Sequence, residues 1–87
     1  MRFKRIQCSA EVEDKLAAKH DVEAWEVEEV RRGVYHDVRI ADLYHLFGRT
    51  DSGRYLHVVL RDLGAGTGRL VTAYDMTQAE RRRYGKR

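Results

Sequence analysis

Histidine, arginine and aromatic residues alternate along two segments in the middle of the sequence. Residues 42–49 and 54–62 are strand-like, and the Thr-Asp-Ser-Gly run at 50–53 between them is typical of a hairpin turn. A three-residue loop pairs Thr50 with Arg54 and places Phe47 opposite His57. One face of this hairpin then carries His45, Phe47, Arg49, Tyr55, His57, Val59 and Arg61.

This mixture of cations, imidazoles and aromatic rings is the chemistry that grips phosphates and stacks nucleic acid bases. An ordinary solvent-facing sheet surface explains the same pattern about equally well. The opposite face of the hairpin is apolar and predicts a core. It carries Leu46, Leu56, Val58 and Leu60. A two-residue turn would shift the pairing by one residue and weaken this assignment of the two faces.

The remaining elements follow from strand and helix signals on either side of this hairpin. Residues 3–8 predict an opening strand, 10–19 a helix capped by Ser9, and 23–32 a second helix stopped by Gly33. Residues 34–40 are weakly patterned and are open to a short edge strand, whereas 69–74 predict a strand after the glycine-rich turn at 64–68. A capping box from Thr77 to Glu80 starts a last helix that runs to about Tyr84.

This order predicts an α+β fold in which helices pack on a small antiparallel sheet. The element order is β-α-α-β-β-β-α, with a fourth strand before the last helix if residues 34–40 pair. The second helix should bury Val27 and Val30 and turn its glutamates, including Glu26, outward. We interpret Trp25 as a residue that covers the core, with an exposed anchor as the alternative.

Length and composition are those of one small domain that spans residues 1–87. The chain is 43% hydrophobic and 36% charged, a balance typical of folded domains and not of disordered chains. Residues 1–47 hold 8 Lys/Arg against 10 Asp/Glu, whereas residues 48–87 hold 9 against 4. The second half therefore carries the basic surface, either as a phosphate-binding face or as a solvated tail that includes Lys86 and Arg87.

Several classes of protein are excluded. No stretch approaches the roughly 18 apolar residues of a membrane helix, the first residues lack the apolar region of a signal peptide, and Cys8 is the only cysteine. A cytoplasmic protein without disulfides or membrane contact is the simplest interpretation. The four histidines lack metal-site spacing and no phosphate-binding glycine loop opens a helix, so we expect neither a metal nor another cofactor.

Metal-free RNA cleavage is compatible with the residues that remain. It needs a group that activates the 2′-hydroxyl, a group that stabilises the pentavalent phosphate and a group that protonates the leaving oxygen. Arginine and lysine hold the developing negative charge, while histidine, glutamate, lysine or tyrosine move the protons. Most small basic proteins contain such residues, so composition alone leaves this function open.

Three segments, in order along the chain, carry a family resemblance. Lys-His-Asp-Val closes the first (residues 15–22, followed by 26–30), a Gly-Arg-Thr-Asp-Ser-Gly turn opens the second (48–59), and Met-Thr followed by Glu-Arg-Arg marks the third (73–84). These motifs resemble the helix segment, the central hairpin and the closing segment of the BrnT-like ribonuclease toxins of bacterial toxin–antitoxin pairs. The resemblance implies a RelE-like fold and an endoribonuclease that needs no metal.

The resemblance also implies partners and site residues. A tightly bound antitoxin, often a ribbon–helix–helix DNA-binding protein, neutralises such a toxin, and a second copy of the chain is another candidate partner because an open sheet edge is often hidden. The implied catalytic residues are Lys19, His20, Glu80, Arg81 and Tyr84. The RNA-binding residues expected from the motifs and from the hairpin face are Arg49, Arg54, Tyr55, His57, Arg61 and Tyr74.

Some positions depart from the family pattern. Tyr74 stands where the family usually has an arginine in the last strand, and Asp21 stands where a glycine usually follows Lys-His. The aromatic–acid pair often found at the end of the first strand is replaced by Gln7 and Cys8. Loss of the strand arginine removes a phosphate contact. The alternative function is therefore a non-catalytic module of the same fold that binds a partner protein or nucleic acid.

The implied site residues also have purely structural interpretations. Lys19 and His20 end a helix, where cations favour the negative end of the helix dipole. Glu80 already belongs to a capping box. Arg49 and Arg54 flank a turn and keep a hairpin soluble, and the arginines of the last helix fit a solvated face.

Overall fold

Strands and helices follow one another in the order β-α-α-β-β-β-β-α in the computed structural model, which describes residues 1–85. Lys86 and Arg87 of the expected basic tail lie outside the described residues. The elements are β1 (Arg5–Gln7), α1 (Ala10–His20), α2 (Ala24–Arg32), β2 (Tyr35–Ile40), β3 (Leu43–Arg49), β4 (Tyr55–Gly64), β5 (Thr67–Asp75) and α3 (Gln78–Tyr84). The α+β class is confirmed. The predicted order with three strands before the last helix lacks one strand, because the weakly patterned segment pairs with β3 along its whole length.

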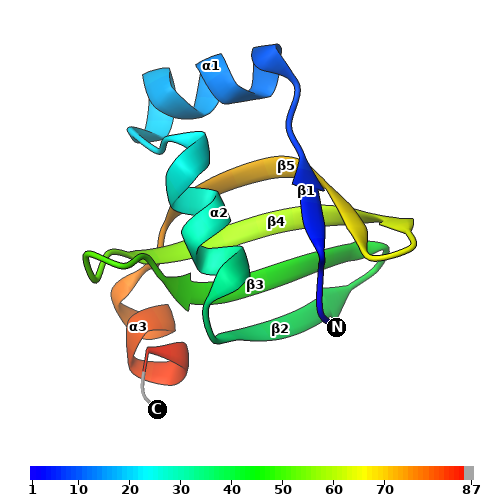
Figure 1. Cartoon of the computed structure of the whole chain (residues 1–87). Coiled ribbons are helices and arrows are strands. Elements are labelled where there is room, and N and C mark those ends of the chain that lie inside the picture. Colours follow the sequence, from blue (N-terminus) through cyan, green and yellow to red (C-terminus); the bar gives the residue numbers. More distant parts are fainter. Residues whose placement is uncertain (86–87) are drawn as a thin grey trace.

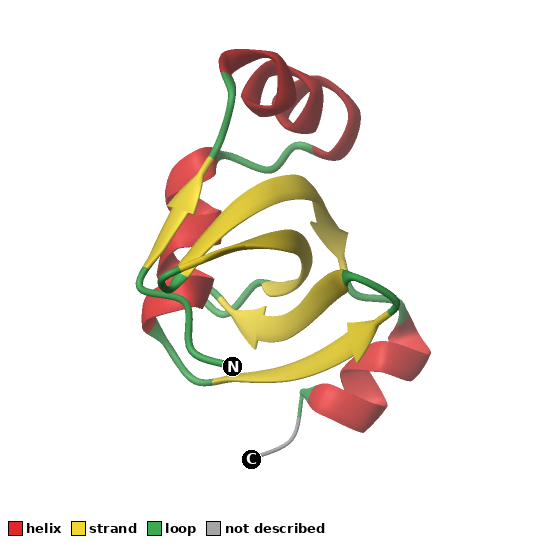
Figure 2. Cartoon of the chain, turned by 90° about the vertical axis from the view of Figure 1, so that its right-hand side faces the viewer, coloured by secondary structure: helices red, strands yellow, loops and turns green. Residues whose placement is uncertain are grey.

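A single sheet contains all five strands, in the order β1-β5-β4-β3-β2 (Figure 1). Strands β2 to β5 form an antiparallel meander, and β1 pairs in parallel with β5. The helices α1 and α2 connect β1 to β2 and lie on one side of the sheet, whereas α3 lies on the other side (Figure 2). We call the side covered by α1 and α2 the inner face and the side that α3 partly covers the outer face.

The hairpin between β3 and β4 has the predicted register. The Thr50 N–H donates to the Arg54 carbonyl oxygen at 2.9 Å, and Phe47 lies opposite His57. Gly53 closes the turn at a φ of 96°, a conformation that suits glycine because it has no Cβ. Because the register is as predicted, alternate side chains of the hairpin lie on the faces assigned to them.

The apolar side of the hairpin forms the core, as predicted. Each of its four residues is fully buried, and burial of one such side chain stabilises the fold by roughly 1.5–3 kcal/mol. Side chains from the two helices that cover the inner face complete the apolar cluster. The core contains Leu46, Leu56, Val58 and Leu60 from the hairpin and Phe3, Leu16, Val22, Val27, Val30, Leu70 and Ala73 from the rest of the chain.

The helix ends follow the sequence signals. The Ser9 hydroxyl accepts from the Val12 N–H at 3.1 Å, which caps α1. The next residue after α1, Asp21, has a φ of 54°, in the left-handed region. Aspartate is one of the few residues besides glycine that adopts this region readily, so Asp21 can replace the glycine that the family resemblance places there. The capping box of Thr77 and Glu80 is also present at the start of α3.

Two predictions about α2 are wrong. Trp25 is 58% exposed and does not cover the core, whereas Glu26 is only 7% exposed. The Glu26 carboxylate accepts from the Glu23 N–H at 3.0 Å and pairs with Arg54 at 2.9 Å. Because consecutive helix residues are about 100° apart, turning Glu26 inward to this arginine leaves Trp25 at the surface.

Candidate functional site

Four rings from four strands lie side by side across the outer face. His36, Phe47, His57 and Tyr74 are direct cross-strand partners, one from each of the strands β2 to β5. We call these four residues the ring row. The Phe47 and His57 rings are stacked with centroids 4.3 Å apart, and the His57 and Tyr74 rings meet edge to face at 4.8 Å. The ring row exists because each strand places an aromatic residue or histidine at the same level of the sheet.

The last helix covers the middle of the ring row. The Tyr84 ring stacks on Phe47 with centroids 4.0 Å apart and an interplanar angle of 13°, and it lies 5.9 Å from the His36 ring. Phe47 and His57 are each 6% exposed as a result. The outer face is therefore not the ordinary solvent-facing surface that was the alternative interpretation. His57, expected to bind RNA, lies beneath this cover and offers little of its ring to a ligand.

Glu80 combines a structural contact with a contact to the ring row. Its Oε1 accepts from the Thr77 N–H at 3.0 Å, which completes the capping box. Its Oε2 lies 3.5 Å from His57 Nδ1. The capping box fixes the first turn of α3, and this turn holds the second carboxylate oxygen over the buried imidazole.

His57 also contacts a second histidine. His45 Nδ1 lies 2.8 Å from His57 Nε2, and the two rings are 5.1 Å apart. Burial lowers the pKa of His57, the Glu80 carboxylate opposes this by favouring the imidazolium, and His45 lowers the pKa further. Burial dominates, so the His57 imidazole is neutral near pH 7.

Two guanidinium groups lie on the ring of Tyr55, beside the ring row. The Arg49 Cζ is 4.9 Å and the Arg81 Cζ is 4.4 Å from the centroid of this ring. Both arginines are exposed, and within residues 1–85 neither guanidinium forms an ion pair with a carboxylate. The sequence predicted Arg49 and Tyr55 as RNA-binding residues and Arg81 as a catalytic residue, and the structure brings the three together as a cationic cluster.

Arg54 does not belong to this cluster. Its guanidinium pairs with Glu26 at 2.9 Å and with Asp75 at 2.7 Å, and it donates to the carbonyl oxygens of His20 and Asp21 at 3.1 and 2.7 Å. The hydrogen bonds to these carboxylates raise the pKa of Arg54. With its donors occupied, Arg54 joins the ends of α1 and β5 to the start of α2 and has no free donor edge for RNA.

Two of the other expected residues lie in or beside the ring row, and two lie away from it. His20 belongs with the ring row, because its ring lies 5.6 Å from that of Tyr74. Burial raises the pKa of Tyr74, and the Glu80 carboxylate raises it further. Lys19 is exposed at the end of α1, and within residues 1–85 it makes no cation–π contact with these rings. Arg61 lies on the outer face at the end remote from α3, where it pairs with Asp42 at 2.6 Å and lowers the pKa of that carboxyl group.

Three residues of the site were not among the expected functional residues. His45 and Phe47 were placed on the correct face by the hairpin register, but the sequence did not identify Phe47 as the residue that Tyr84 of α3 covers. His36 lies in the weakly patterned segment, and its place in the ring row follows from the pairing of that segment with β3. His36 and Phe47 are identified by the level that they share across the strands, and His45 is identified by the hairpin register alone.

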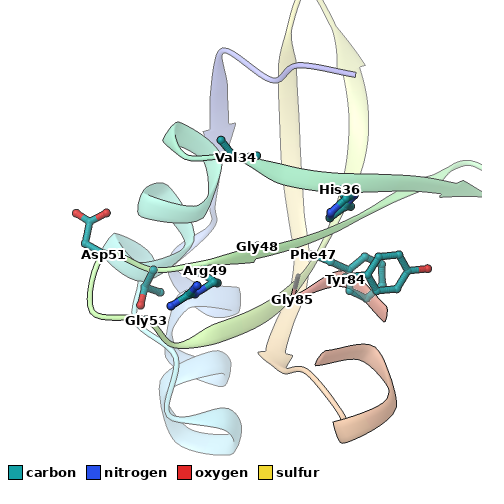
Figure 3. A pocket seen from close by; sticks show the side chains of 10 residues that line it. Val34, His36, Phe47, Gly48, Arg49, Asp51, Gly53, Tyr84 and Gly85 are labelled. Atoms are coloured by element: carbon teal, nitrogen blue, oxygen red, sulfur yellow. The ribbon is translucent and has the colours of Figure 1, made fainter. Parts of the chain in front are cut away.

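A pocket of about 320 Å³ opens beside the ring row (Figure 3). His36, Phe47 and Tyr84 form one side of it, and Arg49 and Asp51 lie towards the hairpin turn. Aromatic surface and a guanidinium group thus line the same pocket, an arrangement that suits a base and its phosphate.

Within residues 1–85, no three His, Cys, Asp or Glu side chains gather as a metal site requires. In the same part of the chain, no helix has the length and apolar character needed to cross a membrane.

No family model matches the sequence, and no curated protein matches it either. A match of fold exists with a solved structure, the ribonuclease toxin BrnT of Brucella abortus. The TM-score is 0.67 at 14% sequence identity, and the superposition covers 85% of this chain and 97% of that one. The chain therefore has the α+β fold of this solved structure.

Proposed function

We propose that this protein is the toxin component of a toxin–antitoxin pair and cleaves RNA without a metal ion, as a single domain in the cytoplasm. The observation that carries the proposal is the cationic cluster of Arg49, Tyr55 and Arg81, which lies next to the imidazoles of the ring row and the Glu80 carboxylate. The fold shared with the BrnT ribonuclease toxin supports it independently.

The cationic cluster supplies the affinity for RNA. Guanidinium groups bind phosphate oxygens through paired donors, and Arg49 and Arg81 are exposed and free of carboxylates within the described chain. The pocket beside the ring row accepts an unstacked base against Tyr84 or His36. A single-stranded segment fits these contacts better than a duplex, because the bases of a duplex remain stacked on one another.

The groups around Glu80 supply the chemistry. Glu80, His20 and Tyr84 can move protons, and Arg81 can stabilise the negative charge that develops on the phosphate. Lys19 is expected to reach a phosphate from the end of α1. In this proposal Tyr74 contacts RNA in place of the arginine typical of the family, and Arg61 extends the binding surface along the sheet.

The second candidate function is a non-catalytic module that binds RNA or a partner protein. Tyr74 favours it, because the partly buried ring of Tyr74 cannot provide the charge of a strand arginine. The two candidates share the RNA-binding surface and differ only in whether a phosphodiester bond breaks.

An antitoxin that covers the outer face would neutralise either form. Charge complementarity favours an acidic segment over the cationic cluster, and a ribbon–helix–helix protein that carries such a segment fits the family resemblance. A second copy of the chain is the other candidate, because the outer edge of β2 has no strand beside it in the described sheet.

The test incubates purified protein with single-stranded RNA in a metal chelator and follows cleavage. Arg81→Ala is expected to lower cleavage by about 10²–10³-fold, the usual effect of losing one group that stabilises an oxyanion. Arg82→Ala is the matched control on the same helix, because Arg82 is exposed and contacts none of the rings of the site. Induced expression should also arrest bacterial growth, and a variant with alanine at Lys19, His20 and Arg81 should relieve the arrest.

Binding without cleavage by the wild-type protein would support the non-catalytic module. Absence of RNA binding, RNA cleavage and growth arrest would refute both the nuclease and the RNA-binding module, and would leave only a module that binds a partner protein.

A further inference from the structure

His45, His57 and Glu80 form a continuous chain of polar atoms on the outer face. His45 Nδ1 lies 2.8 Å from His57 Nε2, and His57 Nδ1 lies 3.5 Å from Glu80 Oε2. The His57 Nδ1 atom is buried and has no hydrogen-bond partner within residues 1–85. A buried ring nitrogen whose polar neighbour is a carboxylate is best satisfied when it carries the proton and points it at that carboxylate.

This arrangement determines where the protons of both rings lie. Burial lowers the pKa of His57, so its ring carries a single proton near pH 7. When that proton is on Nδ1, facing Glu80, the His57 Nε2 atom must accept and the His45 Nδ1 atom must donate. The remaining nitrogen of His45, Nε2, is then unprotonated, as in a general base.

His45 lies where an RNA strand bound to the outer face would pass. Its side chain is half-exposed, unlike the buried His57. Arg49 is four residues further along β3, about 13 Å away at the usual rise of a strand. Arg61 is the diagonal neighbour of His45 on β4, at about 7–8 Å. Guanidinium groups therefore lie on both sides of this imidazole, that of Arg49 without a carboxylate partner within residues 1–85 and that of Arg61 paired with Asp42.

We propose that His45 is a catalytic residue of the RNA cleavage proposed above, and that His57 and Glu80 are positioning residues that hold it in the basic tautomer. This inference rests on the proposed function. His45 Nε2 takes the proton of the 2′-hydroxyl, the 2′-oxygen forms a bond to phosphorus, and the bond from phosphorus to the 5′-oxygen breaks.

The leaving 5′-oxygen takes a proton from water, and the hydroxide that remains takes the proton from His45. The products are a 2′,3′-cyclic phosphate and a 5′-hydroxyl group, and the protein returns to its starting state. The Glu80 carboxylate favours the transient His45 imidazolium through His57, the role that a buried carboxylate has in a catalytic triad.

Other titratable and charged groups face the polar atoms of His45, His57 and Glu80 from the neighbouring elements. None of them is hydrogen-bonded to either imidazole within the described part of the chain. These groups are His20 from α1, His36 from β2, Arg61 from β4, Tyr74 from β5 and Arg81 and Tyr84 from α3.

The test measures single-turnover cleavage of single-stranded RNA as a function of pH. His45→Gln should lower the rate at neutral pH by about 10²–10⁴-fold, the usual contribution of a general base, with RNA affinity unchanged. Glu80→Gln keeps the capping box, because glutamine also serves at this position. The acidic limb of its pH–rate profile should move to lower pH, because the His45 imidazolium loses the stabilising charge of Glu80. The maximal cleavage rate of this variant should also fall.

Glu11→Gln is the matched control, a glutamate-to-glutamine change in the first turn of α1. Its pH profile should coincide with that of the wild-type protein. Cleavage that survives His45→Gln, or an acidic limb that does not move in Glu80→Gln, overturns the inference and leaves the proposed function standing. Absence of cleavage by the wild-type protein overturns both.

Nitrogen-15 NMR of the imidazoles shows which ring nitrogens of His45 and His57 carry a proton, without any reaction. His45 is expected to carry its proton on Nδ1 in the wild-type protein and in His57→Gln, whose amide oxygen can still accept from His45. His57→Phe keeps a buried ring but removes the acceptor, so it should shift His45 towards a mixture of tautomers. A wild-type His45 protonated on Nε2 would overturn the inference.

Discussion

The two faces of the sheet are built on opposite principles. The inner face contains aliphatic side chains, fully buried under α1 and α2, whereas the outer face carries rings and titratable groups under a helix of seven residues. Hydrophobic burial is non-directional, so the inner face needs only apolar residues of suitable volume. The outer face depends on stacked rings, a capping box and hydrogen bonds of defined geometry. We infer that the inner face supplies most of the stability and the outer face supplies the function.

The largest expected loss of stability comes from the inner face. Leu56→Ala should lower the free energy of unfolding by about 2–5 kcal/mol, because it removes buried methyl groups and leaves a cavity. Val34→Ala is the control at a residue that is 78% exposed, and it should change stability by less than about 0.5 kcal/mol. Urea unfolding measures both. Equal effects of the two substitutions would contradict the assignment of the core.

The next largest effect lies where the two faces meet. Arg54→Met leaves the Glu26 carboxylate without its main partner, and the expected loss is somewhat below the ~3–5 kcal/mol of a fully buried pair, because the Arg54 side chain is 24% exposed. Adding Glu26→Gln should restore part of this loss, since it removes the unpaired charge. If the double variant is no more stable than Arg54→Met, the carboxylate is not the source of the loss.

A smaller effect depends on pH and belongs to the outer face. The pKa of His57 is lower in the folded protein than its usual value of 6.5, so the unfolded chain binds a proton first as the pH falls. The stabilising contribution of the neutral ring is thus present above pH 6.5 and is lost as the pH falls below it, at no more than about 1.4 kcal/mol per pH unit. Unfolding measured from pH 7.5 downward should show a shallower decline in His57→Phe. An unchanged decline would show that other groups are responsible.

The smallest effect concerns the cover formed by α3. Tyr84→Leu should lower stability by about 0.5–1.5 kcal/mol, because it removes the stack on Phe47, whereas Tyr84→Phe should preserve it. Hydrogen exchange of the α3 amides reports the same difference, with faster exchange in Tyr84→Leu. Equal exchange in the two variants would show that the ring stack does not hold this helix in place.

The same division between the faces explains what the sequence could predict. The alternating pattern and the turn residues of the hairpin determine its register. The four core residues of the hairpin were therefore identified correctly, namely Leu46, Leu56, Val58 and Leu60. Local signals also identified the caps at Ser9 and Thr77. Residues 34–40 gave only a weak strand signal because their alternation is weak. Residues 35–40 form a strand through pairing with β3.

The outer face was predictable only in part. The sequence placed His45, Phe47 and His57 on one face and was compatible with Tyr84 packing back on the sheet, but it did not identify Phe47 as the ring on which Tyr84 stacks. It also assigned Arg54 to RNA, although the structure gives this residue partners from four distant positions. Contacts between residues far apart in the chain depend on the complete fold, and local periodicity carries no information about them.

The most direct test maps RNA on the two faces by NMR, with Glu80→Gln protein to slow cleavage during the measurement. Addition of single-stranded RNA should shift the amide and side-chain signals of His45, Arg49, Tyr55 and Arg81, with little change at the exposed surfaces of α1 and α2 distant from the ring row. Shifts concentrated on Trp25 and the outer surface of α2, or no shifts at all, would contradict the assignment of the outer face as the surface that works on RNA.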